Sequence, residues 1–241
     1  MNRLLCIFSI FLLFQVNAPG QSRYAVFKLP FSSPDYDEFS PAIRGDSLVF
    51  CSNLEDEFLL TYHDGRNKGL FNIFTIRLDS LGLEKRPDVF SRALVTPFND
   101  GPAAFSPDGR ELVYSRNQKV NARRRNVFKL SNHLGIYFAA LENGTWVPKG
   151  EFSHNHPEYS VTTPCYSHDG KHLYFASDMP GGFGGSDLYR SDRLQEGWSA
   201  PENLGPGINT GGNEAYPYVS ATGDLFFACL LYTSDAADEL T

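Results

Sequence analysis

The chain has 241 residues and carries 21 Lys and Arg against 28 Asp and Glu, which gives a formal net charge of −7 at pH 7. Hydrophobic residues make up 41% and aromatic residues 14% of the sequence. That is enough apolar side chain for a core, so the composition excludes an intrinsically disordered protein. The mild acidity gives no reason to expect nucleic acid as a partner. The 21 Gly and 15 Pro favour many short strands and turns over long helices.

Residues 1–20 have the pattern of a secretory signal peptide. Arg3 supplies the positive start, and the apolar run over 4–14 that follows is too short to span a bilayer. The small residues Ala18 and Gly20 indicate cleavage just before Gln21. We therefore expect an exported protein that does not span a membrane after cleavage. The alternative is an uncleaved anchor helix.

Residues 229–241 break abruptly with the pattern of the preceding sequence. The string from Cys229 to Asp238 resembles the translation of a sequencing-library transposase adapter. We therefore expect residues 229–241 to be a non-native tail, although a native acidic tail is the alternative. On this interpretation the natural gene continues beyond Ala228, and residues 21–228 are a fragment of a longer domain.

Internal repeats are the main guide to the fold. Matching leucines in four similar segments lie 64, 61 and 52 residues apart, and Trp146 and Trp198 are separated by 52 residues. The four segments are FSPAIRGDSLVFCSN (39–53), AAFSPDGRELVYSRN (103–117), PCYSHDGKHLYFASD (164–178) and PYVSATGDLFFA (217–228). A second motif follows each of the first three, as FNIFTIRL (71–78), LGIYFAAL (134–141) and SDLYRSD (186–192). The chain is therefore built from repeated units with insertions of variable length.

Each unit is predicted to contain two hairpins. The turn at residues 106–109 has the sequence Ser-Pro-Asp-Gly, in which Pro presets φ and Gly takes a positive φ, so 103–105 and 111–115 should pair. A second hairpin is predicted over 136–141 and 145–147, joined by an Asn-Gly turn. Corresponding turns are expected near Gly82 and Gly197. Two consecutive hairpins give one four-stranded antiparallel unit.

Strand interiors such as 173–176 are apolar at every position, so both faces of each sheet need cover. Four-stranded units packed face to face around an axis meet that need. The predicted fold class is therefore all-β, an incomplete β-propeller of about three four-stranded blades plus the start of a fourth. A two-sheet sandwich is the alternative, but it would not explain repeats of this period. No amphipathic helix of useful length is expected in residues 21–228.

These motifs resemble the WD40-like propeller repeats of the TolB type, with their S-P-D-G-K-x-L-Y-F-x-S-D signature. The third unit carries it from Ser167 to Asp178, and the second from Ser106 to Ser115. The segment from Asp178 to Tyr189, followed by Trp198 and the stretch 203–210, is similar to propellers of bacterial envelope proteins of the OmpA family. The resemblance implies a periplasmic or outer-membrane location, and some of those proteins are implicated in secretion and gliding machinery.

The sequence departs from this pattern at three points. Arg44-Gly45-Asp46 replaces the signature turn in the first unit, and Ala221-Thr222-Gly223 weakens it in the fourth. No OmpA-like peptidoglycan-binding region is present, so the resemblance does not support a role that depends on one.

One candidate partner-binding region is a basic stretch between Arg110 and Lys129, in a chain that is otherwise acidic. It falls between the second and third strands of its unit and should project as a loop that could bind an acidic partner. A solvated loop without a partner is the alternative. Its candidate contact residues are Lys119, Arg123, Arg124, Arg125 and Lys129. Phe183 is a further candidate, because the glycine-rich segment 181–185 should present it in a tight connection, as a contact or as packing.

Other chemistry-bearing residues point to no catalytic or metal site. Two His and one Glu lie within residues 154–158, but Pro157 marks a loop there, and we expect no metal. Cys51 and Cys165 lie in apolar strands and are expected to be small buried thiols. No nucleophile elbow, phosphate-binding loop, C-x-x-C or H-E-x-x-H motif occurs, so no catalytic residue and no cofactor are expected.

The sequence therefore favours an exported, non-enzymatic propeller that acts as a protein-interaction scaffold in the bacterial cell envelope, with an envelope or outer-membrane protein as its partner. Two alternatives remain open. The chain could be the propeller of a prolyl-oligopeptidase-like hydrolase, or a carbohydrate-binding or lyase propeller that uses its central channel. Fold alone does not decide among them.

Overall fold

The computed structural model describes residues 28–55, 69–80, 86–118 and 133–231. Within these ranges the fold consists of three four-stranded sheets, one two-stranded sheet and two single-turn 3-10 helices, Leu78–Ser80 and Arg92–Leu94. All neighbouring strands in the sheets are antiparallel. In the described ranges, neither helix has the length or the apolar composition that crossing a bilayer requires.

We number the sheets as blades 1 to 4, and in each blade the spatial order of the strands is their order along the chain. Blade 1 contains β1 (Glu38–Arg44), β2 (Ser47–Ser52), β3 (Asn72–Arg77) and β4 (Asp88–Val89). Blade 2 contains β5 (Asp100–Phe105), β6 (Glu111–Asn117), β7 (Leu134–Glu142) and β8 (Thr145–Glu151). Blade 3 contains β9 (Val161–Tyr166), β10 (His172–Ser177), β11 (Asp187–Asp192) and β12 (Glu202–Asn203). Blade 4 contains β13 (Asn213–Val219) and β14 (Leu225–Leu230).

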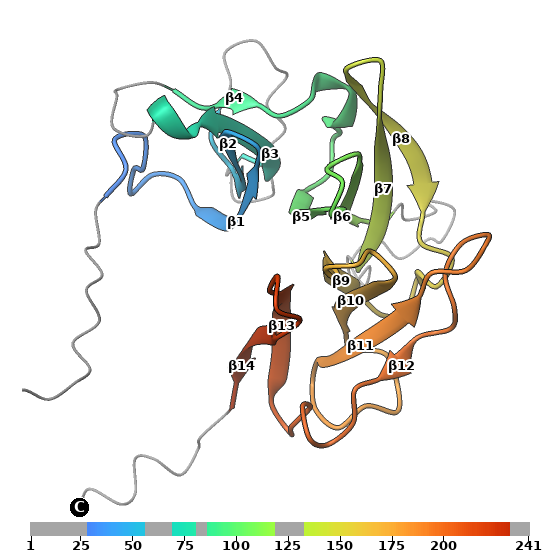
Figure 1. The fold of residues 1–241 in the computed structure, drawn as a ribbon. Helices are drawn as coiled ribbons and strands as arrows, with labels where there is room; N and C mark the ends of the chain where they lie inside the picture. The colour runs from blue at the N-terminus through green and yellow to red at the C-terminus, as the bar shows by residue number, and fades with distance from the viewer. Residues whose placement is uncertain (1–27, 56–68, 81–85, 119–132, 232–241) are drawn as a thin grey trace, which may run out of the picture.

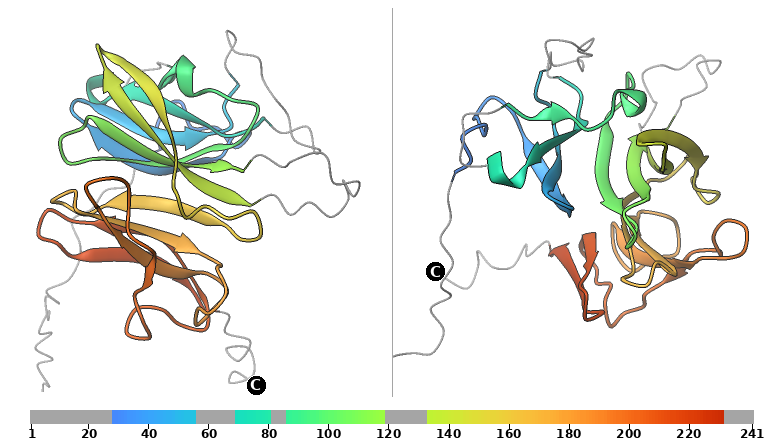
Figure 2. Two further views of the ribbon diagram at one scale, coloured as in Figure 1. Left: turned by 90° about the vertical axis from the view of Figure 1, so that its right-hand side faces the viewer. Right: turned by 45° about the horizontal axis from the view of Figure 1, so that its top comes forward.

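The four sheets are arranged around a common centre (Figure 1; Figure 2, right). The first strand of each blade lies innermost, and β5 contacts both β1 and β9, while β9 also contacts β13. The last strands, β4, β8 and β12, lie at the periphery (Figure 1). This is an incomplete β-propeller with three four-stranded blades and a two-stranded fourth, which confirms the fold predicted from the repeats.

The hydrophobic cores lie between the blades, because each sheet buries both of its faces. Leu112 and Val113 are consecutive residues of β6, and both are fully buried. Leu112 belongs to the core shared with blade 1, where it joins Val49. Val113 belongs to the core shared with blade 3, where it joins Leu173. Full burial of a side chain of this size contributes roughly 1.5–3 kcal/mol, so consecutive apolar residues stabilise two blade interfaces at once.

The signature turn is held by its own side chains. The Ser106 hydroxyl donates to Asp108 Oδ1 and accepts from the N–H of Glu111, at 2.5 and 2.9 Å. Ser167 and Asp169 repeat these contacts in blade 3, and the hydrogen bond from the Ser167 hydroxyl lowers the pKa of Asp169 to about 2. These residues therefore fix the geometry of the hairpins.

The weakened turn of blade 4 keeps the same plan. Ser220 Oγ accepts from the N–H of Asp224, and the N–H of Gly223 donates to the carbonyl of Ser220. In blade 1 the short turn has Gly45 at φ +57°, a conformation that glycine adopts without steric cost. Both departures from the signature are thus compatible with a tight hairpin.

In each four-stranded blade, the polar residue at the last position of the signature accepts a hydrogen bond from a backbone N–H just before the first strand. Asn53 accepts from the N–H of Asp37, and Asp178 accepts from the N–H of Ser160, at 2.7 and 2.6 Å. Asn117 accepts from the N–H of Asn99 in the same way. The side chain at the end of the second strand, or directly after it, therefore fixes the start of the first strand in each of these blades.

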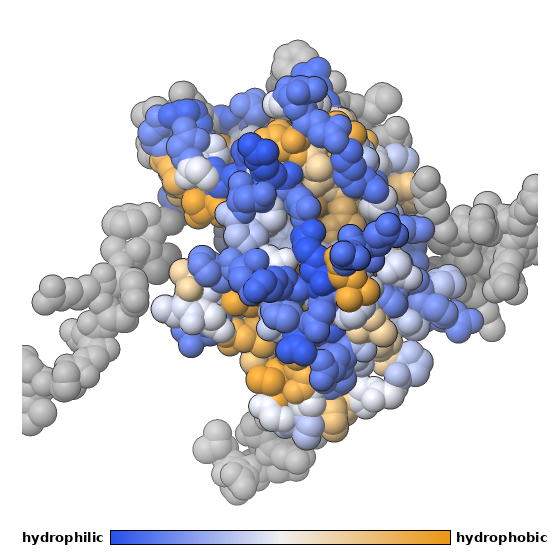
Figure 3. Space-filling view, turned by 45° about the vertical axis from the view of Figure 1, so that its right-hand side comes forward, coloured by the Kyte–Doolittle hydropathy of each residue, from blue (hydrophilic) through white to orange (hydrophobic). Residues whose placement is uncertain are grey.

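The hairpins predicted with turns at 106–109, at 143–144 and near Gly197 occur there, although the strands are longer than expected. The turn predicted near Gly82 lies outside the described residues. The last strand runs to Leu230, two residues beyond the end of the repeat segment 217–228. Cys51 and Cys165 are buried and free, as expected. On the face shown in Figure 3, hydrophilic residues predominate and interrupt the apolar ones, which fits a protein whose cores lie between the sheets.

Candidate binding cavity at the centre of the propeller

All four innermost strands carry the same bulge, in which two residues lie opposite a single residue of the second strand. The first bulge residue has φ between +49° and +106°, and the second is proline in every blade. The pairs are Ser40-Pro41, Gly101-Pro102, Thr163-Pro164 and Tyr216-Pro217. A positive φ costs roughly 1–2 kcal/mol for a residue other than glycine. Three of the four blades carry this cost at the centre of the propeller.

Contacts from the preceding blade hold two of the bulges directly. The N–H of Thr163 in blade 3 donates to Ser115 Oγ of blade 2 at 2.9 Å, in a buried hydrogen bond. The N–H of Tyr216 in blade 4 donates to Thr163 Oγ1 at 3.4 Å. In blade 2 the bulge residue is Gly101, and a Cβ atom there would lie 2.1 Å from the Sγ of Cys51 in blade 1. In blades 2, 3 and 4 the bulge therefore packs against or hydrogen-bonds to the preceding blade, and in blade 2 this contact leaves room only for glycine.

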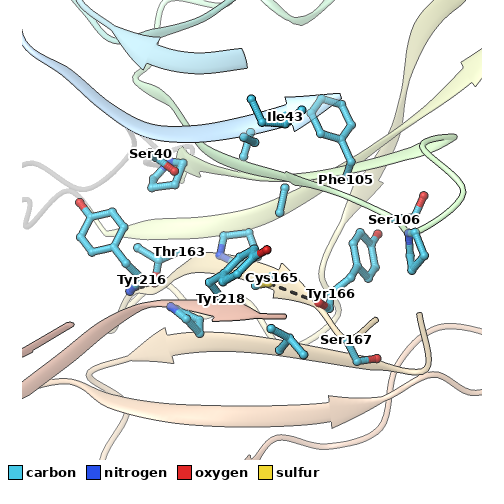
Figure 4. Close-up of a pocket in the computed structure, with 18 of the residues that line it drawn as sticks. Ser40, Ile43, Phe105, Ser106, Thr163, Cys165, Tyr166, Ser167, Tyr216 and Tyr218 are labelled. Carbon is cyan, nitrogen blue, oxygen red and sulfur yellow. Dashed lines mark hydrogen bonds between the residues drawn. The ribbon is translucent and has the colours of Figure 1, made fainter. Parts of the chain in front are cut away.

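The bulges line a cavity of about 830 Å³ at the centre of the propeller (Figure 4). Its walls come from the four innermost strands and from the turns that follow β5 and β9. Five of the lining residues are prolines, and none of the described lining residues is Asp, Glu, Lys or Arg. Charged residues make up 20% of the chain, so the uncharged lining differs from the composition of the whole.

Two tyrosines of β13 and one isoleucine of β1 are the most exposed large side chains of the lining. Tyr218 is 61% exposed, Tyr216 49% and Ile43 61%. Figure 4 shows the tyrosines on the β13 side of the cavity and Ile43 with Phe105 on the other. Neither tyrosine hydroxyl makes a hydrogen bond to another described residue, and burial raises the pKa of Tyr216. The cavity therefore presents phenolic hydroxyls as free hydrogen-bond donors.

Three possible nucleophiles of the lining, Cys165, Ser106 and Ser167, already have structural partners. The Cys165 thiol donates to the carbonyl of Tyr166 at 3.3 Å, and burial raises its pKa. The hydroxyls of Ser106 and Ser167 hold the signature turns. Among the described residues, His168 makes no hydrogen bond to any of these three groups. The contacts of Cys165, Ser106 and Ser167 therefore give these three groups structural roles.

The predicted basic region lies mostly outside the described residues, and this holds for Lys119, Arg123, Arg124, Arg125 and Lys129. In sequence, residues 119–132 fall between the second strand of blade 2, which ends at Asn117, and the third, which begins at Leu134, as predicted.

Arg116 does not belong to a projecting loop, and this corrects the expected extent of the basic loop. It lies in β6, where its guanidinium pairs with the buried Asp100 and stacks over the rings of Tyr114 and Tyr137 at 5.0 and 5.4 Å. Burial raises the pKa of Asp100 to about 6, although Arg116 and the hydroxyl of Thr96 act against this shift.

The glycine-rich segment around Phe183 wraps a buried carboxylate. The N–H groups of Phe183 and Gly184 donate to the two oxygens of Asp187, at 2.7 and 3.0 Å. A Cβ atom on Gly184 would lie 2.2 Å from the carbonyl oxygen of Gly212, so close packing explains this glycine. Phe183 itself is 51% exposed at the surface of this anchored loop. It remains a candidate contact residue.

The histidines of residues 154–158 serve different contacts. His154 lies 3.3 Å from the carbonyl of Trp198, and the ring of His156 stacks on Tyr159 with centroids 4.5 Å apart. In the part of the chain that the structure describes, no three His, Cys, Asp or Glu side chains are grouped as metal ligands would be.

Sequence reasoning missed the proline bulges and the cavity that they line. The signal was present, because Pro41, Pro102, Pro164 and Pro217 are 61, 62 and 53 residues apart, which is close to the spacing of the matching leucines. Proline is tolerated at edge strands and bulges. Because a proline recurs at the same position of each first strand, the sequence indicates that these strands lie at an edge of their sheets.

The chain is part of a propeller domain, because its sheets are arranged radially, its cores lie between the blades and its innermost strands surround a central cavity.

No protein-family model and no curated protein matches the chain. Similar solved structures include a TolB protein from Acinetobacter baumannii, with 18% identity, a TM-score of 0.49, and 83% of this chain and 39% of that one covered. A putative TolB from Agrobacterium tumefaciens has 19% identity and a TM-score of 0.47, with 77% and 51% covered. A puromycin-hydrolysing peptidase from Mycobacterium tuberculosis has 18% identity and a TM-score of 0.45, with 81% and 28% covered. The chain thus spans about half the length of the putative TolB and less of the other two.

Proposed function

We propose that this chain is an exported, non-enzymatic propeller that acts as a protein-interaction scaffold in the bacterial cell envelope and binds a segment of its partner in the central cavity. The observation that carries the proposal is the uncharged cavity with the exposed Tyr216 and Tyr218. A pocket of several hundred Å³ with apolar walls and a few free polar groups is the usual form of a binding site.

The lining supports binding without turnover. The hydroxyls of Ser106 and Ser167 and the thiol of Cys165 are engaged in structural hydrogen bonds, and none of the three is hydrogen-bonded to His168. Export and an envelope partner are supported by the signal-like pattern of residues 1–20 and by the resemblance of the repeats to envelope propellers. OmpA-family membership and a link to secretion or gliding machinery remain part of this proposal.

Site-specific photocrosslinking tests the binding role. A photoreactive phenylalanine analogue replaces Tyr218 in the full chain expressed in a bacterial host that carries the native envelope. The matched control places it at Leu194, which is 53% exposed and does not line the cavity. We expect a discrete crosslinked envelope protein from position 218 and none from position 194. Identical patterns from the two positions, or no product at 218, would contradict the proposed site.

Cell fractionation tests export separately. We expect the processed protein in the periplasmic or outer-membrane fraction, with Gln21 as its first residue. Recovery of the unprocessed chain in the cytoplasm would contradict export without bearing on the cavity.

A further inference from the structure

We propose that the segment bound in the cavity is an uncharged, proline-rich peptide in the polyproline II conformation. The proposal rests on the proposed function, because it names the chemistry of the partner segment. Three properties of the lining support the proposal: its charge, its hydrogen-bonding groups and its aromatic surface.

The charge of the lining favours an uncharged occupant. None of the described residues that line the cavity is Asp, Glu, Lys or Arg, and its one histidine is His168. A charged ligand would lose its hydration there without gaining an ion pair, which is strongly unfavourable. An acidic peptide, a phosphate group or a charged sugar is therefore disfavoured.

The innermost strands disfavour an occupant that adds as a β-strand. Strands β1, β5, β9 and β13 each pair on one side only, so their other edge faces the centre. Each carries a proline in its bulge, and proline has no N–H to donate. Prolines and bulges at an edge prevent strand addition. A ligand that relies on a regular backbone ladder would find that ladder interrupted on every wall.

The free polar groups of the lining complement a proline-rich backbone. A peptide of prolines offers carbonyl acceptors and no N–H donors, and in polyproline II its backbone forms no internal hydrogen bonds. The hydroxyls of Tyr216 and Tyr218 are donors without a partner among the described residues. Proteins that bind this conformation do so in aromatic-lined grooves, because the ligand is already ordered before binding. Exposed tyrosine rings next to proline walls provide such a surface.

Titration of the full chain with a labelled decaproline peptide, followed by fluorescence anisotropy, tests the proposal. We expect saturable binding that Tyr218→Phe weakens roughly three- to tenfold, because that substitution removes one hydroxyl donor and keeps the ring. Tyr218→Ala should weaken it further. Tyr174→Phe is the matched control, since Tyr174 lies in β10 and does not line the cavity, and it should leave binding unchanged.

Two further ligands separate the alternatives. A glycine-serine peptide of equal length is uncharged but has no polyproline II preference, and we expect it not to bind. Maltohexaose represents a neutral glycan and should not bind either. Binding of decaproline that is unaffected by Tyr218→Ala, equal binding of the glycine-serine peptide, or binding of maltohexaose alone would overturn the proposal. If decaproline fails while position 218 still crosslinks to an envelope protein, the scaffold function stands and this inference falls.

Discussion

The backbone N–H of Thr163 in blade 3 donates to the hydroxyl of Ser115 in blade 2 at 2.9 Å, and both groups are buried. Thr163 has φ +49°, which is unusual for a β-branched residue. The hydrogen bond therefore links a strained bulge of one blade to the second strand of its neighbour. Ser115 also accepts from the hydroxyl of Thr162, so one side chain secures two consecutive residues.

Ser115→Ala should destabilise the fold by about 1–3 kcal/mol, because it leaves the buried N–H of Thr163 without an acceptor. Chemical denaturation monitored by circular dichroism measures the change. Ser33→Ala is the control, since Ser33 makes only exposed hydrogen bonds, and it should change the free energy of unfolding by less than about 0.5 kcal/mol. Equal changes in the free energy of unfolding for the two substitutions would show that the interblade hydrogen bond does not stabilise the fold.

Gly101→Ala should be more destabilising than Gly109→Ala. Both glycines have positive φ, but alanine at 101 would place its Cβ 2.1 Å from Cys51 Sγ, whereas the space around Gly109 is open. The conformational cost of about 1 kcal/mol is common to both, and overpacking adds roughly 1–3 kcal/mol at 101. Thermal melts compare the two variants. The second substitution Cys51→Ala should recover part of the loss at Gly101→Ala, and a purely additive double variant would refute the clash.

Arg193 and Arg44 should respond differently to salt. Arg193 pairs with Glu111 of the neighbouring blade at 2.5 Å and lies 4.7 Å from the Trp198 ring. Arg44 lies 5.2 Å from the Trp146 ring and donates to the carbonyl of Gly109. We expect each arginine-to-alanine substitution to cost about 1 kcal/mol at low salt, because the ion pair is half-exposed. In 1 M NaCl the cost of Arg193→Ala should decrease, while that of Arg44→Ala should persist.

The buried pair of Asp100 and Arg116 should make stability depend on pH. Burial raises the pKa of Asp100 to about 6, above its ordinary value of 3.8, so the folded state binds this proton more tightly than the unfolded state. The contribution of the group to stability is therefore largest below pH 4 and decreases between about pH 4 and 6, by on the order of 3 kcal/mol.

Denaturation curves at a series of pH values test this, with Asp100→Asn for comparison. The variant should lack the component that decreases over this interval, whatever its absolute stability. If the difference in unfolding free energy between the two proteins is constant from pH 4 to 6.5, Asp100 does not titrate there.

The parts of the fold that the sequence predicted are those fixed by local chemistry. Ser106 and Gly109 specify a turn within four residues, and the run of apolar residues at 173–176 indicates a sheet covered on both faces. The bulges at Thr163 and Tyr216 depend on contacts from another blade, and neither residue type indicates a positive φ. The central cavity depends on these bulges, and the sequence marks them only by the recurring prolines, which indicate edge strands but not the shape or lining of a cavity.

For the candidate binding residues, too, local features could be predicted from the sequence and long-range contacts could not. Counting basic residues placed Arg116 with its neighbours in one loop, but its position in a strand turns it toward Asp100, sixteen residues earlier in the chain. Such a pair is not visible in the charge pattern. The glycine-rich segment around Phe183 joins two strands, as predicted, whereas its hydrogen bonds to Asp187 are not indicated by the glycine pattern.

The separate cores of Leu112 and Val113 also restrict how such a chain can change in length over evolution. Loss of one or two strands from blade 2 would expose the apolar faces of both neighbouring blades. Duplication or deletion of an entire repeat, in contrast, would bring equivalent sheet faces together, so every core would still lie between two sheets. Lineages of this domain should therefore differ by whole repeats or by the loops between strands.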